Sequence, residues 1–349
     1  MSSLDTSLDR LVPPTRVRAW FEFGGRHAWT LLGVGLLVGA VVPFVVGDGF
    51  YLSVAGEMLM FAVLALSWDI VGGQTGYPSF GQMAFFGIGG YVTAIMFRDF
   101  GVFWPGLVLA GVLSLVAAAV IGAVVLRLRG GYFAIATLGI LLTLTEITRN
   151  ISITNGVDGI SFLSTLPATT FYYVFLGLLG VEAGLLYYLS QTRFGYTLNA
   201  IRDDEAKVNA MGVNTTYYKV TAWMLAALFT GMAGGAWSLF NFFIDPLTAY
   251  NTAWNVELIA MALLGGTGTI VGPILGGMGL HAIIRLFVET YFTGWQLGLL
   301  GLIIIVTIIV VPSGVVGWLE ERASAMDYYE HGGGAAGEES GGETGGEPE

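Results

Sequence analysis

Long hydrophobic runs without a single charged residue dominate the pattern of this chain. Four of them, at 70–97, 100–126, 258–284 and 290–319, each exceed the roughly 20 residues that a helix needs to cross a bilayer. Their apolar residues are continuous rather than alternating, which favours helices over barrel strands. Because lipid offers no hydrogen-bond partners, a spanning segment must satisfy its own backbone. The pattern therefore predicts an all-α polytopic membrane protein.

The same pattern divides the chain into about ten transmembrane or partly spanning helices. The eighth is short, and only Gly265–Gly268 and the Gly272-Pro273 pair separate it from the ninth. A short or glycine-interrupted segment indicates a half-helix or a re-entrant element. The ten segments lie near 29–47, 51–71, 80–97, 102–126, 131–148, 169–190, 220–240, 255–265, 272–288 and 296–312.

Small residues recur at four-residue spacing inside several segments, for example at Ala227, Gly231 and Gly235. Small residues at this spacing let helix backbones approach closely in lipid. With 52 glycines in the chain, we expect a tightly packed helical bundle.

The positive charges orient this bundle. If the N-terminus is cytoplasmic and every segment crosses, 11 of the 14 lysines and arginines fall on the cytoplasmic side. Cytoplasmic loops of membrane proteins carry such an excess. We therefore expect a cytoplasmic basic segment at 1–28, a membrane domain at 29–319 with a cytoplasmic loop at 193–219, and a tail at 320–349. Both chain ends are then cytoplasmic.

Composition supports a membrane protein and limits its chemistry. Hydrophobic residues make up 55% of the chain and charged residues 11%, against about 25% charged residues in soluble domains. Cysteine is absent, which excludes disulfides and thiol chemistry. The net charge of −11 and the Gly/Glu-rich tail predict a disordered C-terminus. An acid-rich, lysine-poor balance is typical of a high-salt cytoplasm, so a haloarchaeal source is one interpretation, and an ordinary acidic tail is the other.

The loop at 193–219 is the main hydrophilic interruption of the membrane part. Asp203 is placed to N-cap a short helix and lies four residues before Lys207. Ala206 and Ala210 fall on one face, and Gly212 suits the C-terminal stop. The loop is therefore predicted to form a short amphipathic helix at the cytoplasmic surface, facing a water-soluble partner.

Signatures of enzymes and metal sites are missing from the sequence. It has no G-x-x-x-x-G-K-[ST] motif, so it has no P-loop of its own. Its three histidines have no metal-ligand spacing, and His281, four residues before Arg285, is better explained as a packed residue than as a polar handle in a pathway. Glu182 lies in the middle of an uncharged run, where an ionisable residue is costly. An ion-coupled transporter would use such residues in series, and an intramembrane enzyme would need a Ser–His pairing; the sequence has neither.

Residues 72–82, GGQTGYPSFGQ, combine four glycines and a proline with several hydrogen-bonding side chains at the edge of a segment. Broken backbone at this depth is stable when it is buried in protein or lines a wet cavity. A plain cytoplasmic turn is the alternative. We favour a pathway, because an uncharged segment follows at once.

At these residues the chain resembles the LivM-type permease of branched-chain amino acid ABC importers, over about residues 50–320. Motifs occur in the family's order. They are Gly73-Gln74-Thr75-Gly76, Ser79-Phe80-Gly81-Gln82 and 84–89; then 127–130 and 132–139; then Glu146-Ile147, Arg149, Thr154-Asn155-Gly156 and Asp158-Gly159; then Arg193-Phe194-Gly195, 200–202, Ala210-Met211-Gly212 and Tyr218-Lys219; and finally Leu264-Gly265-Gly266, Gly268, Gly272-Pro273, Pro312, Gly314 and Gly317.

The resemblance implies a bundle like that of type II ABC importers and a cytoplasmic loop that couples to an ATPase subunit. In this chain Glu205-Ala206 opens the coupling element, with Lys207 where the family pattern has alanine and with Gly212 seven rather than six residues after Glu205. The residues expected to couple are Arg202, Asp203, Asp204, Glu205, Ala206, Ala210, Met211 and Gly212. Those expected along the translocation path are Gly73, Gln74, Thr75, Gly76, Ser79, Gly81, Gln82, Glu146, Asn155, Asp158, Gly265 and Gly266.

The resemblance also implies the partners. They are a LivH-like second permease, two ATPase subunits, an extracytoplasmic amino-acid-binding protein and the lipid bilayer of the cell membrane, with no nucleic acid. ATP would be hydrolysed by the partner subunits, so we expect no cofactor, metal or catalytic residue in this chain. The expected function is import of branched-chain or related small amino acids. Urea and short-amide permeases look similar and are the alternative, ahead of an ion-coupled transporter.

Overall fold

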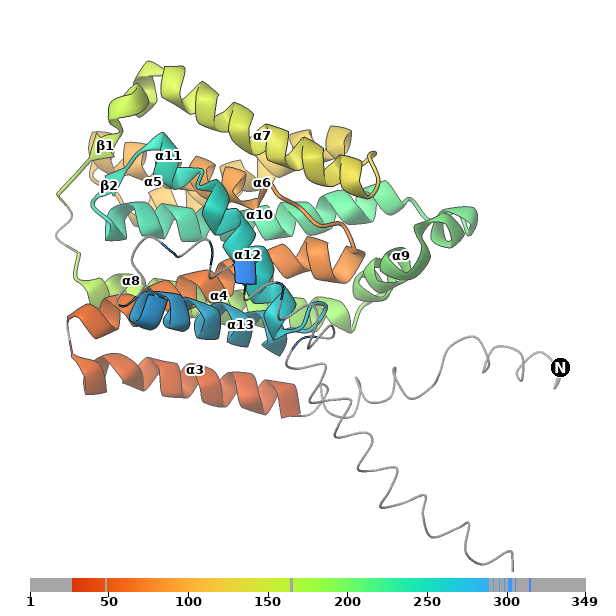
Figure 1. The fold of residues 1–349 in the computed structure, drawn as a ribbon, viewed down its shortest axis with the longest axis horizontal. Helices are drawn as coiled ribbons and strands as arrows, with labels where there is room; N and C mark the ends of the chain where they lie inside the picture. The colour runs from red at the N-terminus through yellow and green to blue at the C-terminus, as the bar shows by residue number, and fades with distance from the viewer. Residues whose placement is uncertain are drawn as a thin grey trace, which may run out of the picture.

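The computed structural model describes residues 27–47, 49–163, 166–288 and seven positions beyond 288. Almost all of this part is helical (Figure 1). The predicted basic segment at 1–28, apart from its last two residues, and the tail at 320–349 lie outside the described residues. The elements are α3 (His27–Val46), α4 (Phe50–Thr75), α5 (Gln82–Phe100), α6 (Trp104–Val125), α7 (Gly131–Asn150), η1 (Ser152–Thr154), η2 (Gly156–Asp158), β1 (Ile160–Ser161), α8 (Ala168–Ser190), α9 (Arg193–Ala210), α10 (Thr215–Phe240), β2 (Phe243–Ile244), α11 (Pro246–Ala249), α12 (Thr252–Gly265), α13 (Val271–Ile283) and the π-helical turn η3 (Ile284–Val288).

Most of the long helices run along one common direction, which is horizontal in Figure 1. Helix α7 lies along one edge of the bundle and α3 along the opposite edge. Helix α9 protrudes beyond one end of the bundle, and the antiparallel pair β1–β2, with Ile160 opposite Ile244, closes the other end. Successive long helices alternate in direction, as expected for segments joined by short connections across a membrane.

The centre of the bundle is built on α4 and α10, which are buried over most of their length. Glycines let α10 approach α5 at backbone distance. A Cβ atom at Gly89 would overlap the carbonyl oxygen of Gly231, and one at Gly234 would overlap that of Phe86. Gly231 and Gly235 also pack against α6 at Ser114 and Ala110. The prediction of close packing along Ala227, Gly231 and Gly235 is confirmed.

Six described helices are long and apolar enough to cross a membrane: α4, α6, α7, α8, α10 and α13 extended through η3. The count of about ten is not confirmed. The side chains described in α3 give only a shorter apolar stretch, Gly33–Val46, and α12 has 14 residues. The tenth predicted segment, 296–312, lies outside the described residues except at single positions.

The predicted interruption between the eighth and ninth segments is present. Helix α12 ends at Gly265, and Gly266 and Gly268 adopt positive φ angles of 118° and 80° before α13 begins at Val271. Such backbone is disfavoured for residues with a side chain. The two helices pack so closely that a Cβ at Gly265 would overlap the carbonyl oxygen of Gly272. We call α12, this glycine turn and α13 the α12–α13 hairpin.

Candidate functional site

The protruding helix α9 has two parts. Its backbone leaves the helical region at Asp204, where φ is −160° and ψ is 94°. The side chain of Asp204 then accepts a hydrogen bond from the backbone N–H of Lys207 at 3.1 Å and pairs with its Nζ, also at 3.1 Å. The sequence predicted one short helix capped by Asp203. A short helical part does follow the kink, but a longer part that begins at Arg193 precedes it, and Asp204 rather than Asp203 caps the short part, because the chain is already helical when it reaches Asp203.

The end of α9 agrees with the prediction. Gly212 adopts a left-handed conformation with φ of 85°. The N–H of Gly212 donates to the carbonyl of Asn209 at 2.9 Å, and that of Val213 donates to Val208 at 3.4 Å. These two bonds are the pattern of a Schellman motif, which satisfies the last carbonyls of a helix. The outer surface here is exposed, including Ala206, Ala210, Met211 and Gly212, and the Met211 side chain is 81% exposed.

Glu205 points away from this exposed surface and into the bundle. Its carboxylate accepts hydrogen bonds from Lys219 Nζ and from Thr215 Oγ1, both at 2.7 Å, and from the Tyr77 hydroxyl. Arg129 Nε lies 3.8 Å from the same carboxylate. We call these five residues the Glu205 hub. The hub joins α9 to α10, to the α4–α5 connection and to the α6–α7 connection.

The buried charged groups of the hub are paired with one another. The Lys219 side chain is 2% exposed, and its ammonium group lies 4.1 Å from the centre of the Tyr77 ring. Burial raises the pKa of Glu205, but hydrogen bonds from Lys219, Tyr77 and Thr215 outweigh it, so the net pKa is lowered. Burial and then the bond to Glu205 raise the pKa of the Tyr77 hydroxyl, which stays a donor. The hub is therefore an ionised, hydrogen-bonded contact at neutral pH.

Arg202, also in α9, contacts a different part of the bundle. Its NH1 donates to the carbonyl oxygen of Gly73 at 2.9 Å, near the end of α4. One turn earlier in α4, Asp69 Oδ1 accepts a hydrogen bond from the backbone N–H of Gly268 at 2.8 Å, and Gln74 Nε2 donates to the Gly268 carbonyl at 3.3 Å. Helix α9 is thus connected through the end of α4 to the glycine turn of the α12–α13 hairpin.

Most of the predicted path residues around the α4–α5 connection are buried within this chain. Gln82 donates through Nε2 to Thr230 Oγ1 of α10 at 2.5 Å. Thr75 donates to the Val71 carbonyl at 2.7 Å, and the Ser79 hydroxyl accepts from the Gly81 N–H at 3.3 Å. Each is almost fully buried. These side chains fix the connection in the described conformation, and their place in a path stays a prediction. The same holds for the glycines Gly73, Gly76, Gly81, Gly265 and Gly266, most of which allow close backbone contacts.

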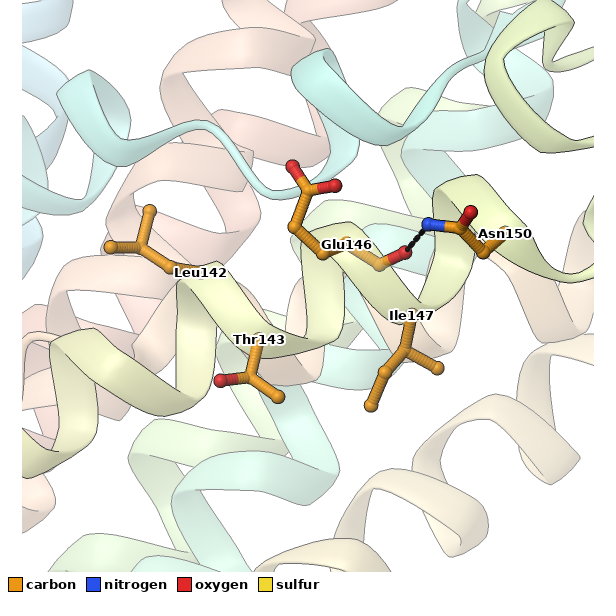
Figure 2. Close-up of a pocket in the computed structure, with 5 residues that line it drawn as sticks. All are labelled: Leu142, Thr143, Glu146, Ile147 and Asn150. Atoms are coloured by element: carbon orange, nitrogen blue, oxygen red, sulfur yellow. Dashed lines mark hydrogen bonds between the residues drawn. The ribbon is translucent and has the colours of Figure 1, made fainter.

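Glu146 lies on an outward-facing surface of α7 together with Thr143 and Asn150, all of them exposed. We call these three residues the α7 polar face; Ile135, Leu142 and Ile147 are exposed beside it. Figure 2 shows Leu142, Thr143, Glu146, Ile147 and Asn150 beside a surface hollow of about 540 Å³. Glu146 pairs with Arg149 at 3.0 Å, and Asn150 Nδ2 donates to the Glu146 carbonyl at 2.7 Å.

The exposed face of α6 is different. At every fourth position it presents a valine, and these are Val108, Val112, Val116, Val120 and Val124. A surface of this kind suits hydrocarbon, whereas a carboxylate exposed on a spanning helix is costly there. Of the two helices, α6 therefore has the better surface for lipid, and α7 the better surface for protein or water.

Asn155 and Asp158 lie at the β1–β2 end, the opposite end from α9. Asn155 has a left-handed backbone, with φ of 62°, and its Nδ2 donates to the Gly159 carbonyl at 2.7 Å. Asp158 is exposed. The predicted path residues are therefore spread between both ends of the bundle and are not one contiguous cluster.

The structure brings together residues that the sequence did not place with Glu205. Its partners are Tyr77, Arg129, Thr215 and Lys219. The presence of Lys219 at the start of an otherwise uncharged helix was the available signal, because a buried lysine requires an anion. The predicted outlier Glu182 is fully buried in α8, where its Oε1 accepts from Ser67 Oγ at 2.5 Å. It therefore links α8 to α4.

Comparison with known proteins agrees with this architecture. The family described as "Branched-chain amino acid transport system / permease component" matches residues 50–309. The chain is 29% identical over 321 residues to the high-affinity branched-chain amino acid transport system permease protein LivM of Salmonella typhimurium, covering 81% of this chain and 74% of that protein. LivM of Escherichia coli is 29% identical over 320 residues with the same coverage. The probable LivH permease of Methanocaldococcus jannaschii is 26% identical over 289 residues, covering 74% and 89%. No solved structure is a significant match.

Proposed function

Because the chain belongs to the family of branched-chain amino acid transport permease components, we propose that it is a permease subunit of an ATP-driven importer for branched-chain or related small amino acids. The observation that carries this proposal is the family match over 260 consecutive positions, 50 through 309, which covers the described bundle from α4 through η3. The bundle supplies a membrane-embedded scaffold, and the chain has no P-loop. Its energy therefore comes from another subunit.

We assign α9 to contact with an ATPase subunit. The exposed surface at the end of the helix, formed by Ala206, Ala210, Met211 and Gly212, is available to a partner. On the opposite side, Glu205 and Arg202 bind the bundle. A displacement of α9 on ATP binding is thus transmitted in two directions: through Glu205 to α10, and through Arg202 to α4 and the glycine turn of the α12–α13 hairpin.

We assign the α7 polar face to the second, LivH-like permease and to the translocation path between the two chains. Glu146 and Thr143 are satisfied there by a protein or an aqueous surface rather than by lipid. The valine row of α6 then faces the bilayer. Asn155 and Asp158 lie near the outer mouth, where an extracytoplasmic binding protein delivers substrate. In this arrangement the protein lies in the cell membrane with α9 and both termini in the cytoplasm, and it needs two ATPase subunits and no nucleic acid.

The coupling assignment is tested by co-expressing the chain with its second permease and candidate ATPase subunits. Met211→Glu places a charge in the proposed contact, and we expect loss of ATPase co-purification and of substrate-stimulated ATP hydrolysis. Leu163→Glu is the matched control for ATPase co-purification, because Leu163 is also highly exposed, at 89%, but lies next to β1 at the opposite end. Unchanged ATPase binding in Met211→Glu would refute the assignment of α9.

The path is tested by binding-protein-dependent uptake of labelled leucine, with labelled urea as the second substrate. Glu146→Gln should lower leucine uptake at unchanged protein level. Asp99→Asn should not, although Asp99 is also an exposed carboxylate paired with a neighbouring arginine, at 2.7 Å. Uptake of urea but not leucine would replace the substrate assignment, and uptake that survives ATP depletion would overturn the importer itself.

A further inference from the structure

A mixed cluster of charged side chains lies where α4, α12 and α13 meet, at a place to which neither α9 nor α7 contributes. The ring of His281, on α13, has one carboxylate near each nitrogen. Nε2 lies 3.3 Å from Glu57 Oε2 of α4, and Nδ1 lies 3.8 Å from Glu257 Oε1 of α12. Arg285 Nε, in η3, lies 3.2 Å from the same oxygen of Glu57. One face of the imidazole stacks on Phe61 with 4.3 Å between the ring centres.

Two polar atoms of this cluster face each other without forming a hydrogen bond. His281 Nδ1 and Glu257 Oε1 are both buried without a hydrogen bond, in residues that are 7% and 8% exposed. They face each other across 3.8 Å, which is too long for a hydrogen bond. Buried polar atoms without partners are costly and therefore rare in native proteins. A proton on Nδ1 would make this nitrogen a donor facing the Glu257 carboxylate, and a small shift of either side chain would then close the hydrogen bond.

Hydrogen-bond capacity leads to the same conclusion. A neutral imidazole has one N–H, so it can donate to Glu57 or to Glu257 but not to both. An imidazolium has two N–H groups and can donate to both carboxylates. With a neutral His281, two carboxylates face one guanidinium, and the cluster is left with an uncompensated negative charge; a second proton on His281 neutralises it. Uncompensated charge is costly away from water.

We propose that this cluster is a proton-binding site that fastens the α12–α13 hairpin to α4. His281 takes up a proton from water, forms N–H bonds to Glu57 and Glu257 together, and releases the proton to water when the contact opens. Among the described residues, the charged groups that face His281 are Glu57 from α4, Glu257 from α12 and, through Glu57, Arg285 from η3.

The position of the cluster means that the proton affects how firmly the α12–α13 hairpin is held on α4. Besides the close packing of Gly277 on Ala62, the α12–α13 hairpin has polar attachments to α4 at two places, namely Asp69 with Gly268 at the glycine turn and His281 with Glu57 farther along α13. The first attachment joins a backbone N–H to the Asp69 carboxylate. The second depends on a histidine, whose ordinary charge change falls between pH 5 and 8. Loss of the proton from His281 therefore loosens the end of the hairpin that lies at Glu57.

The experiment measures the thermal unfolding temperature of the full-length chain in detergent micelles from pH 5 to pH 8.5. We expect the unfolding temperature to fall as the pH rises, and one part of this fall, which we call the step, comes from loss of the imidazolium bridge. His281→Gln should remove the step, and any fall that remains belongs to buried carboxyl groups such as Asp69. A double variant, His27→Gln with His331→Gln, is the control, because it leaves His281 as the only histidine and should keep the step. Glu257→Gln should move the midpoint to lower pH, since the imidazolium loses an anionic partner.

The proposal is overturned if the unfolding temperature of His281→Gln falls with pH as much as that of the wild type, or if the step is lost in the double control variant. If His281→Gln does not fold, the Glu257→Gln variant decides, and an unchanged midpoint in it overturns the proposal. These readouts need no substrate, ATPase or second permease, so their result is independent of the transport assays above.

Discussion

The buried ion pair between Lys219 and Glu205 can be tested by a substitution for which the chain offers its own control. Lys219→Met keeps the aliphatic stem and removes the ammonium group, so packing is largely retained. The variant loses the 2.7 Å hydrogen bond to Glu205 and the contact with the Tyr77 ring. It leaves the Glu205 carboxylate, whose side chain is 12% exposed, without its main cation.

The size of the effect follows from these losses. A hydrogen bond to a charged group is worth about 1.5–3 kcal/mol, and a cation–π contact about 0.5–2 kcal/mol. Removing one partner of a buried pair costs about 3–5 kcal/mol, but Glu205 keeps its hydrogen bonds from Thr215 and Tyr77. We therefore expect a loss of about 2–4 kcal/mol in the free energy of unfolding.

The assay is unfolding of the purified chain in mixed micelles of a mild detergent and SDS, followed by circular dichroism. Lys207→Met is the matched control, because Lys207 is the only other lysine of the chain. Its side chain is 83% exposed and pairs with Asp204 at the surface, where water screens the pair. A double-mutant cycle with Glu205→Gln measures the pairwise coupling. The reasoning is refuted if Lys219→Met destabilises no more than Lys207→Met, or if the two hub substitutions are additive.

Three further predictions follow from single positions. Gly212→Ala should lower the free energy of unfolding by about 1–2 kcal/mol, because φ of 85° is unfavourable for residues with a Cβ. Gly212→Asn should lower it by less in the same unfolding measurement, and an equal loss would argue against a backbone cause. Glu205→Gln should lower the free energy of unfolding at pH 7, and this difference from wild type should vanish as the pH falls. The pKa of Glu205 is lowered in the folded chain, so its contribution to stability is full above the ordinary value of 4.5 and is lost as the pH falls through the folded value. A difference that stays constant in acid titrations would contradict the hub. Gly89→Ala should abolish folding or lower the free energy of unfolding by at least about 3 kcal/mol, because the added Cβ overlaps the backbone of α10. The control, Gly177→Ala, should express normally, because a Cβ there meets open space. Equal yields of the two variants would exclude the close contact.

Much of the architecture was available from the sequence. A bilayer accepts only backbone that satisfies its own hydrogen bonds, so uncharged runs of about 20 residues have one structural outcome. The spacing of Ala227, Gly231 and Gly235 predicted close packing, and Gly212 predicted the end of α9. The short eighth segment and the glycine turn that follows it were also predicted. Each of these features depends on residues that are near one another in the chain.

The partners across the bundle were decided by tertiary structure. Asp69 bonds Gly268 across 199 positions, His281 contacts Glu57 across 224, and Ser67 bonds Glu182 across 115. Nothing in the local pattern of one helix says which other helix its polar residue will face, because neighbours in a bundle are chosen by the packing of whole surfaces. The same reason explains why the inward orientation of Glu205 was missed: the charge pattern identified the helix, and the buried Lys219 determined which way the Glu205 carboxylate points.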